Sequence, residues 1–309
     1  MTIEELLNHR LIFVAGKGGV GKSTIASSLA LACARQGRRA LIVECDGQQQ
    51  MALLFGSEPL SAEEITLAPN VYGISIDTEA ALTTFAKGHL PLSAISQHFV
   101  NNRAVRYFLD ATPGLKELMT LTHIVDRAHG EEDQTIIVDL PATGHGLALL
   151  SVPSIVERAV HAGPLKECAE RVLEMINDKK QAAICFVTLA EELPVRETVE
   201  LRERVAQELG TDIGPVIANG VHRFLVDDEA LEHIDHLKEE WMGDKEKSLL
   251  VEGFKLTKSR SDLNERYIEE IEEAFGSAPT IVPFLFTEEI GYEDLTLIAD
   301  ILAKDSPPL

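Results

Sequence analysis

A glycine-rich segment near the N-terminus, residues 16–24, constrains this chain more than any other feature of its sequence. Its letters, GKGGVGKST, fit the frame G-x-x-x-x-G-K-[ST], in which glycines let the backbone curl round an anion with its N–H groups pointing inward. An apolar run at 11–15 precedes it and is typical of a buried strand, and apolar residues at helical spacing follow it, namely Ile25, Leu29, Ala32 and Cys33. Strand, loop and helix in this order predict a phosphate-binding loop on a helix N-terminus, and hence a nucleotide-binding protein.

The residue types within this loop suggest separate roles. Lys22 is placed to reach the terminal phosphates, and the hydroxyl of Ser23 is placed to ligate a Mg²⁺ bound to them. Lys17 is not needed by the loop itself, so it is either a solvated side chain or a second lysine directed at phosphate. The loop residues expected to contact ATP are Gly16, Gly18, Gly19, Val20, Gly21, Lys22, Ser23 and Thr24.

Composition narrows the class of protein. Hydrophobic residues make up 45% and charged residues 25% of the 309 residues, which is typical of a soluble globular protein. The 28 basic and 50 acidic residues give a net charge of −22, which argues against nucleic acid as the main ligand. The sequence contains no apolar run long enough to span a bilayer and no basic N-terminal signal. We therefore expect a cytoplasmic protein, and the four cysteines, which form no C-x-x-C pair, fit a reducing compartment.

Strand-like and helix-like segments alternate along the chain. Further strands are predicted at 39–44, 71–76, 135–139, 182–189, 214–219 and 280–283, and further helices at 155–159, 164–177, 194–209, 227–274 and 293–303. A helical region is expected from about 79 to 129, with Pro113-Gly114 as a break. This order predicts an α/β fold with a doubly wound, mostly parallel sheet, as in a P-loop NTPase. We expect a single domain over residues 1–309, with a helical insertion at about 80–130.

Two aspartates follow predicted strands at the edge of the sheet where ligands bind in such folds. Asp46 comes after the second strand, where a carboxylate is able to orient water for attack on a γ-phosphate; alternatively it starts a turn with Gly47. Asp139 ends a buried strand, as a Walker-B aspartate does, and is expected to hold Mg²⁺ directly or through water.

The segment at 17–24 resembles the signature K-G-G-V-G-K-[ST] of the deviant-Walker ATPases, the group that contains MinD, ParA, the nitrogenase iron protein and the arsenite-pump ATPase. In that group the first lysine reaches across a dimer interface to the nucleotide of the partner. The resemblance therefore implies a homodimer with two facing ATP molecules, in which Lys17 acts with Asp46 in catalysis.

The residues after Asp139 narrow the resemblance. Residues 139–145, DLPATGH, are similar to the D-T-A-P-T-G-H switch of the ArsA-type family, which includes the arsenite-pump ATPase and the ATPase that targets tail-anchored membrane proteins. Residues 187–192, leading to Glu197-Thr198, also resemble a strand-to-helix turn of that family. The resemblance implies adenine contacts from Asn219, Pro283 and Phe284. The implied switch residues are Asp46, Gly47, Asp139, Pro141, Thr143, Gly144 and His145.

The chain also departs from that family. The family's first switch reads D-P-A-H, whereas residues 46–49 read DGQQ, so the coupling of hydrolysis to the helical region is expected to differ. The cysteine pair that binds zinc across the targeting dimer is missing from the sequence, and Cys168 alone does not suggest a metalloid site. Met119 is the one methionine between residues 80 and 130, which favours a compact cap over a wide groove for transmembrane segments.

The sequence therefore predicts an ATP- and Mg²⁺-dependent ATPase that works as a homodimeric switch and couples hydrolysis to binding and release of a protein partner or client. We expect no nucleic acid partner, and membrane contact only indirectly if at all. Two alternatives stay open. One is a spatial organiser like MinD or ParA, and the other is a nucleotide-dependent scaffold that has lost hydrolysis through its altered first switch.

Overall fold

A computed structural model describes most of the chain, namely residues 1–45, 47–76, 81, 112, 114–130, 133–209, 212–223 and 245–304. The side chains of residues 143, 212, 245–248 and 304 are outside this description. Asp46 and most of the expected helical region at 79–129 also lie outside the described residues, as does the first part, 227–244, of the helix predicted at 227–274.

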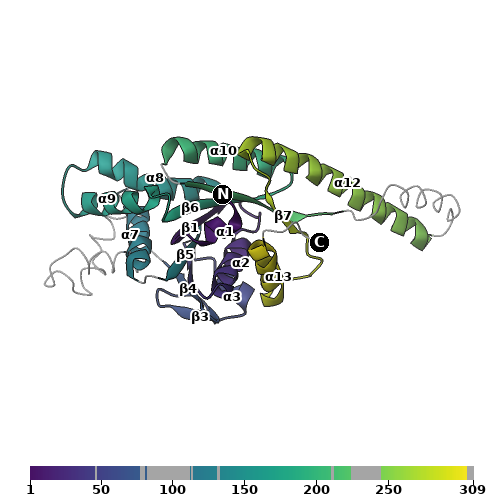
Figure 1. The fold of residues 1–309 in the computed structure, drawn as a ribbon, viewed down its shortest axis with the longest axis horizontal. Coiled ribbons are helices and arrows are strands. Elements are labelled where there is room, and N and C mark those ends of the chain that lie inside the picture. Colours follow the sequence, from purple (N-terminus) through teal and green to yellow (C-terminus); the bar gives the residue numbers. More distant parts are fainter. Residues whose placement is uncertain are drawn as a thin grey trace.

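In the described part of the chain, eight strands form one sheet in the order β3-β4-β2-β5-β1-β6-β7-β8 (Figure 1). All neighbouring strands are parallel except β3 and β4, which are antiparallel. The strands are β1 Leu11–Gly16, β2 Arg39–Glu44, β3 Ile65–Ala68, β4 Val71–Ser75, β5 Gln134–Asp139, β6 Ala182–Leu189, β7 Asp212–Val221 and β8 Thr280–Pro283. On one side of β1 the strands follow in chain order as β6, β7 and β8, whereas the other side holds β5, β2, β4 and β3, with β5 between β1 and β2. Strands added on both sides of β1 are the pattern of a doubly wound sheet.

The central strands are buried on both faces, which explains why they read as continuous apolar runs rather than as alternating ones. Every residue of β1 and β5 is buried. Residues of β1 alternate between two hydrophobic clusters. Leu11 and Phe13 belong to the cluster on one face of the sheet, and Ile12 and Val14 belong to the cluster on the opposite face. The sheet therefore separates two cores, each of which needs its own layer of helices.

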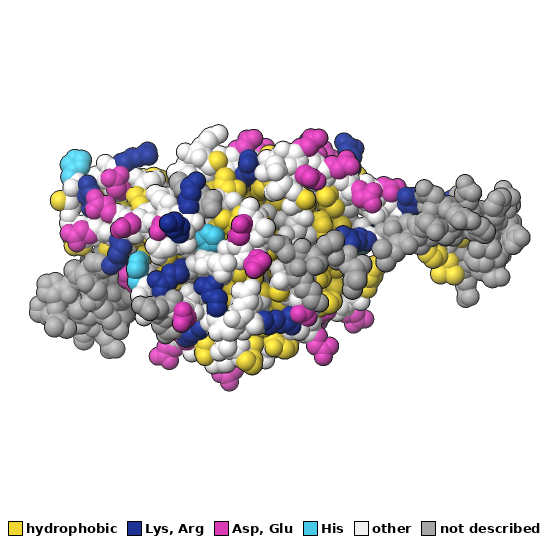
Figure 2. Space-filling view, viewed as in Figure 1, with side chains coloured by type: hydrophobic (Ala, Val, Ile, Leu, Met, Phe, Trp, Pro, Cys, Tyr) yellow, Lys and Arg dark blue, Asp and Glu magenta, His cyan; other side chains and the backbone are white. Residues whose placement is uncertain are grey.

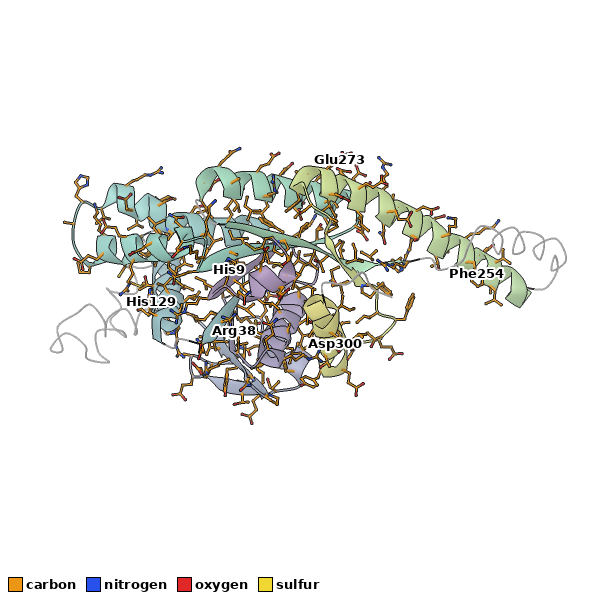
Figure 3. All side chains as sticks on the ribbon, in the orientation of Figure 1. His9, Arg38, His129, Phe254, Glu273 and Asp300 are labelled. Carbon is orange, nitrogen blue, oxygen red and sulfur yellow. The ribbon has the colours of Figure 1, made fainter. Side chains whose placement is uncertain are left out.

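Helices cover both faces (Figure 1). One layer contains α1 Ile3–Leu7, α2 Lys22–Arg35, α3 Gln50–Phe55 and α13 Tyr292–Lys304. Arg35 on α2 forms an ion pair with Asp300 on α13. Asp300 is labelled in Figure 3. The other layer contains α7 Leu115–Gly130, α8 Thr143–Ala159, α9 Pro164–Asn177, α10 Glu192–Glu208 and the inner end of α12 Lys245–Phe275. The predicted fold class is thus confirmed.

Several elements differ from the prediction. The helix expected at 155–159 begins much earlier, because α8 starts at Thr143, inside the predicted second switch. The short elements α1, α3 and β3 were not predicted. The helix expected after Gly114 is present as α7, and its apolar residues Leu115, Leu118, Met119 and Val125 are buried, so they pack into the core.

The long helix α12 extends beyond the sheet (Figure 1), and Phe254 on this outer part is 41% exposed (Figure 3). Acidic and basic side chains are interspersed over the face seen in Figure 2, which is the usual appearance of a solvated surface. Searched over the described residues, the chain offers no helix with the length and apolar character required to cross a membrane.

Candidate nucleotide-binding site

The glycine-rich loop connects the end of β1 to the start of α2, as the sequence predicts. Gly19 and Gly21 have φ angles of 86° and 89°, in the left-handed region that glycine adopts without steric cost. Gly21 is the N-cap of α2, so the free N–H groups at the start of that helix face the inside of the loop. The loop has the conformation and the helix dipole that a bound phosphate requires.

Gly16 is needed for a second reason, which is the close approach of β6. Gly16 is paired with Val187 in the parallel ladder between β1 and β6. A Cβ atom at residue 16 would lie 2.3 Å from the carbonyl oxygen of Val187, a separation that real Cβ atoms do not adopt. The first glycine of the motif therefore lets the loop leave the sheet beside its neighbouring strand.

The two residues predicted to hold the metal lie against each other. The hydroxyl of Ser23 donates a hydrogen bond of 2.6 Å to Oδ2 of Asp139. Asp139 ends β5, which neighbours β1, and only 7% of the residue is exposed. A hydroxyl and a carboxylate oxygen at the foot of a phosphate-binding loop are the hard oxygen donors that Mg²⁺ prefers, so the donor set fits this ion.

The two lysines of the loop have different partners. The Nζ atom of Lys22 donates to the main-chain carbonyl of Lys17 at 3.1 Å, which curls its side chain back over the loop. The Nζ atom of Lys17 forms an ion pair of 2.8 Å with Oε1 of Glu197, on α10 of the same chain. The resemblance to the deviant-Walker group implied a contact of Lys17 with a second subunit, and Glu197 was not predicted to be its partner.

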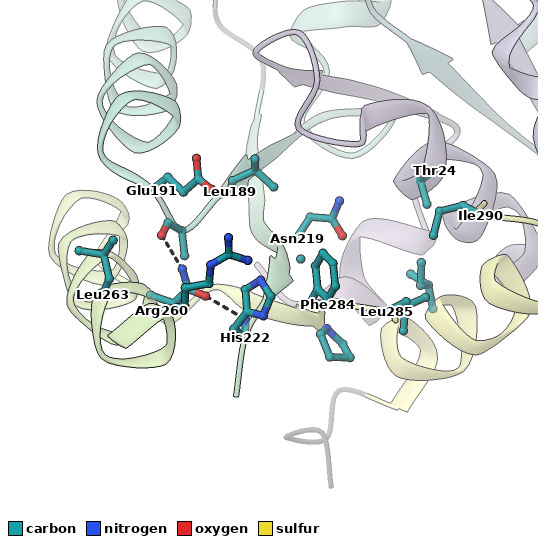
Figure 4. A pocket seen from close by; sticks show the side chains of 15 residues that line it. Thr24, Leu189, Glu191, Asn219, His222, Arg260, Leu263, Phe284, Leu285 and Ile290 are labelled. Carbon is teal, nitrogen blue, oxygen red and sulfur yellow. Dashed lines mark hydrogen bonds between the residues drawn. The ribbon is translucent and has the colours of Figure 1, made fainter. Parts of the chain in front are cut away.

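A cavity of about 570 Å³ opens beside the loop (Figure 4). Asn219, Pro283 and Phe284, which the family resemblance implied as adenine contacts, all line it together with Thr24. These residues come from the ends of β7 and β8 and the start of α2, so strands far apart in sequence deliver them to one place. The cavity has the size and mixed lining of a small-molecule site.

Helix α12 contributes residues to this cavity that the sequence did not reveal. Asn264, only 7% exposed, accepts a hydrogen bond of 2.8 Å from the backbone N–H of His222 and donates one of 2.8 Å to the carbonyl of Ala190 (Figure 4). Its side chain thus ties α12 to the ends of both β6 and β7. Arg260, one helical turn earlier on α12, also lines the cavity.

His222 covers one side of the cavity. Its ring stacks on Phe284, with ring centroids 4.4 Å apart and an angle of 21° between the planes. Burial, and secondarily the Arg260 guanidinium, lowers the pKa of His222 from its ordinary 6.5, whereas Glu191 opposes this change. A neutral, stacked imidazole extends the aromatic surface of Phe284.

Part of the predicted switch region surrounds a second cavity, of about 630 Å³. Gly47, Pro141 and His145 line it, and residues of α7 form another wall, namely Lys116, Glu117 and Thr120. Gly144 lies in the first turn of α8, and the side chain of Thr143 is not described. The structure therefore brings three of the predicted switch residues, Gly47, Pro141 and His145, together next to the helix that leads from the predicted insertion.

The chain belongs to the ArsA-type family of anion-transporting ATPases, whose family model it matches over residues 9–166. That segment contains the phosphate-binding loop, Asp139 and His145. Over 221 residues the chain is 36% identical to the ATPase BagA of Mycobacterium tuberculosis, an alignment that covers 68% of this chain and 64% of that protein, less than two thirds of its length.

Two further relatives are also named as ATPases. The chain is 33% identical over 171 residues to the ATPase ASNA1 homolog 1 of Paramecium tetraurelia, covering 52% of this chain and 49% of the relative. It is 24% identical over 360 residues to the ATPase GET3 of Kluyveromyces lactis, covering 100% of this chain and 96% of the relative.

Proposed function

We propose that this chain is a Mg²⁺-dependent ATPase that works as an ATP-driven homodimeric switch and couples hydrolysis to binding and release of a protein partner. The observation that carries the proposal is the 2.6 Å contact between Ser23 and Asp139 at the foot of the phosphate-binding loop. The loop supplies phosphate-directed N–H groups, and these two side chains supply oxygen ligands beside them. Membership of a family of ATPases supports the same reaction.

The described residues divide the work of phosphoryl transfer. The loop N–H groups and the amine of Lys22 bind the phosphates, while Asn219, Pro283 and Phe284 enclose the base. Ser23 and Asp139 would hold Mg²⁺, which when bound neutralises charge on the phosphate oxygens. Asp46, which follows β2 in the sequence and lies outside the described residues, is proposed to position the attacking water, with Lys17 stabilising charge across the dimer.

The proposed coupling of hydrolysis to binding of a protein partner rests on the second cavity. Because Gly47 and His145 line it together with residues of α7, loss of the γ-phosphate at the loop is able to change the packing of α7. We propose that this movement changes the affinity for a protein partner. The net charge of −22 disfavours nucleic acid as that partner, and membrane contact would be indirect.

Hydrolysis is tested by removing the metal ligands. Ser23→Ala and Asp139→Asn are expected to lower Mg²⁺-dependent phosphate release by about 100-fold or more, because the removed groups act on the charge that develops in the transition state. Binding of ATP in EDTA should change much less. Ser28→Ala is the matched control, since Ser28 lies on the same helix with a buried hydroxyl that has no hydrogen-bond partner among the described residues. Equal rates in wild type and Ser23→Ala would contradict the proposal.

The switch is tested by sedimentation of wild type and Asp46→Asn with ATP and with ADP. We expect an ATP-dependent dimer that the variant holds for longer. Binding of the ATP form to liposomes or DNA would instead support a spatial organiser, and tight ATP binding without phosphate release would support a scaffold. The partner is then sought by affinity capture on Asp46→Asn with ATP, using ADP as the reference.

A further inference from the structure

The topology of the sheet places the start of α10 beside the phosphate-binding loop. Strands β1 and β6 are neighbours, and their ladder runs to the pair Gly16 and Val187, at the point where the loop begins. Helix α10 starts at Glu192, shortly after β6 ends at Leu189. Residues of its first turns therefore lie next to Lys17, although they are far away in sequence.

Glu197 is the residue of α10 that contacts Lys17. Its Oε1 lies 2.8 Å from the Nζ of Lys17, and the two side chains are 32% and 28% exposed. The helix packs into the core at this point, because Val195 and Thr198 are buried. Glu197 thus stands on a helix packed against the core, whereas Lys17 lies in the loop that precedes α2.

The contact conflicts with the role proposed for Lys17 in the dimer. The Lys17 side chain, whose ammonium lies 2.8 Å from a carboxylate of its own protomer, is directed at α10, so it must change conformation to reach the nucleotide of a second protomer. Closing the dimer therefore has to break this pair in both subunits. A phosphate chain carries more negative charge than one carboxylate and is able to compete for the amine once it is close.

We propose that Glu197 is a latch that holds Lys17 inside its own protomer and so sets how readily ATP closes the dimer. This inference rests on the proposed homodimeric switch. Glu197 acts through Lys17 and is a positioning residue. The ion pair is partly exposed, so breaking it costs little free energy, and the phosphates of ATP are able to replace Glu197 as the partner of Lys17. Two such pairs must break for each dimer that forms.

The first test examines the contact in the nucleotide-free protein. Acetylation of lysines by acetic anhydride, followed by mass spectrometry, measures the reactivity of the Lys17 amine relative to that of Lys166. We expect Lys17 to react severalfold faster in Glu197→Gln than in wild type. Glu192→Gln is the matched control, because it removes an exposed ion pair with Arg196 from the same helix without touching Lys17. Unchanged Lys17 reactivity in Glu197→Gln would overturn the proposal.

The second test measures the dimer directly. Sedimentation with ATP should show tighter association of Glu197→Gln, by about fivefold for each pair broken and so up to about 25-fold per dimer, while Glu192→Gln behaves as wild type. In a Lys17→Ala background, Glu197→Gln should have no further effect on dimerisation. A purely structural role for Glu197 would instead weaken the dimer in both backgrounds.

The outcomes separate the latch from the function on which it rests. If wild type dimerises with ATP and Glu197→Gln associates equally or less well, the latch is wrong and the switch stands. If neither wild type nor any variant dimerises, the homodimeric switch itself is wrong, and the latch falls with it. Equal melting temperatures of the variants in the absence of nucleotide establish that folding does not cause the differences.

Discussion

The side-chain amide of Asn219, at the end of β7, donates a hydrogen bond of 2.9 Å to the carbonyl of Val20 in the phosphate-binding loop. The same amide nitrogen would lie only 2.2 Å from a Cβ atom at residue 21, so the glycine there is what lets the two segments approach. One residue thus lines the cavity for the base and ties that cavity to the loop that binds phosphate.

This arrangement predicts that Asn219→Ala weakens ATP binding by about fivefold, because a hydrogen bond worth about 1 kcal/mol is lost and the loop is released from β7. Preference for ATP over GTP should fall as well. Calorimetric titration with both nucleotides measures the two effects. Asn8→Ala serves as the control, because it removes a side-chain hydrogen bond at the C-terminal end of α1, before the start of β1, whereas the loop follows the end of β1. Unchanged affinity and preference would show that the amide plays no part in binding.

The close approach of Gly16 to β6 predicts a large loss of stability in Gly16→Ala. The added methyl would meet the Val187 carbonyl at 2.3 Å, and both groups belong to buried central strands that are unable to move apart freely. We expect the free energy of unfolding to fall by about 2 kcal/mol or more, measured by urea denaturation. Gly253→Ala on α12 is the control. Among the described residues, no atom outside the neighbouring turns of α12 lies within 4 Å of its added methyl, so a small gain in stability is expected.

The strands were predictable because a doubly wound sheet buries its central strands on both faces, which leaves uninterrupted apolar runs such as 11–15 and 182–189. The short elements were not. Helix α3 has only six residues and begins after Gln49, which has a φ angle of 60°, so its sequence lacks both length and a normal cap. Strand β3 has four residues and is only partly buried. Helix α8 begins with Gly144 and Gly146 in its first turn and contains Pro153, all of which disfavour helix.

The parts of the candidate site that are formed by residues close together in the sequence were predictable. The loop is one contiguous motif, and Asp139 ends a strand whose apolar run is plain in the sequence. By contrast, Lys17 meets Glu197 only because β1 and β6 are neighbours, and Asn264 reaches the cavity only because α12 packs across the ends of β6 and β7. No spacing in the sequence encodes such contacts, since they depend on the strand order of the finished sheet.

The cysteines are predicted to differ strongly in reactivity. Burial raises the pKa of Cys33 to about 11 and also raises the pKa values of Cys168 and Cys185, so few thiolates form at these residues near neutral pH. Cys45 is partly exposed. Titration of the native protein with a disulfide reagent at about pH 8 should give one fast thiol, and Cys45→Ser should remove that phase. Four thiols should react after denaturation. A fast phase that persists in Cys45→Ser would contradict the assignment.

The burial of His123 allows a prediction of how the stability of the protein depends on pH. The residue lies on α7 with 6% of its surface exposed, and neither ring nitrogen has a hydrogen-bond partner among the described residues. Burial lowers the pKa of His123 below its ordinary 6.5, and the nearby Arg127 lowers it further, whereas Asp126 acts in the opposite direction. Between the folded and the unfolded pKa, only the unfolded chain binds the proton. The contribution of His123 to stability is therefore complete above pH 6.5 and is lost as the pH falls through the folded pKa.

We accordingly expect the free energy of unfolding in urea to be smaller at about pH 5.5 than at about pH 7.5, and the difference to shrink in His123→Leu, whose side chain binds no proton. Some dependence should remain in that variant, because the pKa of His222 is lowered as well. His161→Asn, at an exposed position between α8 and α9, should keep the full dependence of wild type. If His123→Leu loses as much stability on acidification as wild type does, the buried imidazole is not the group that titrates.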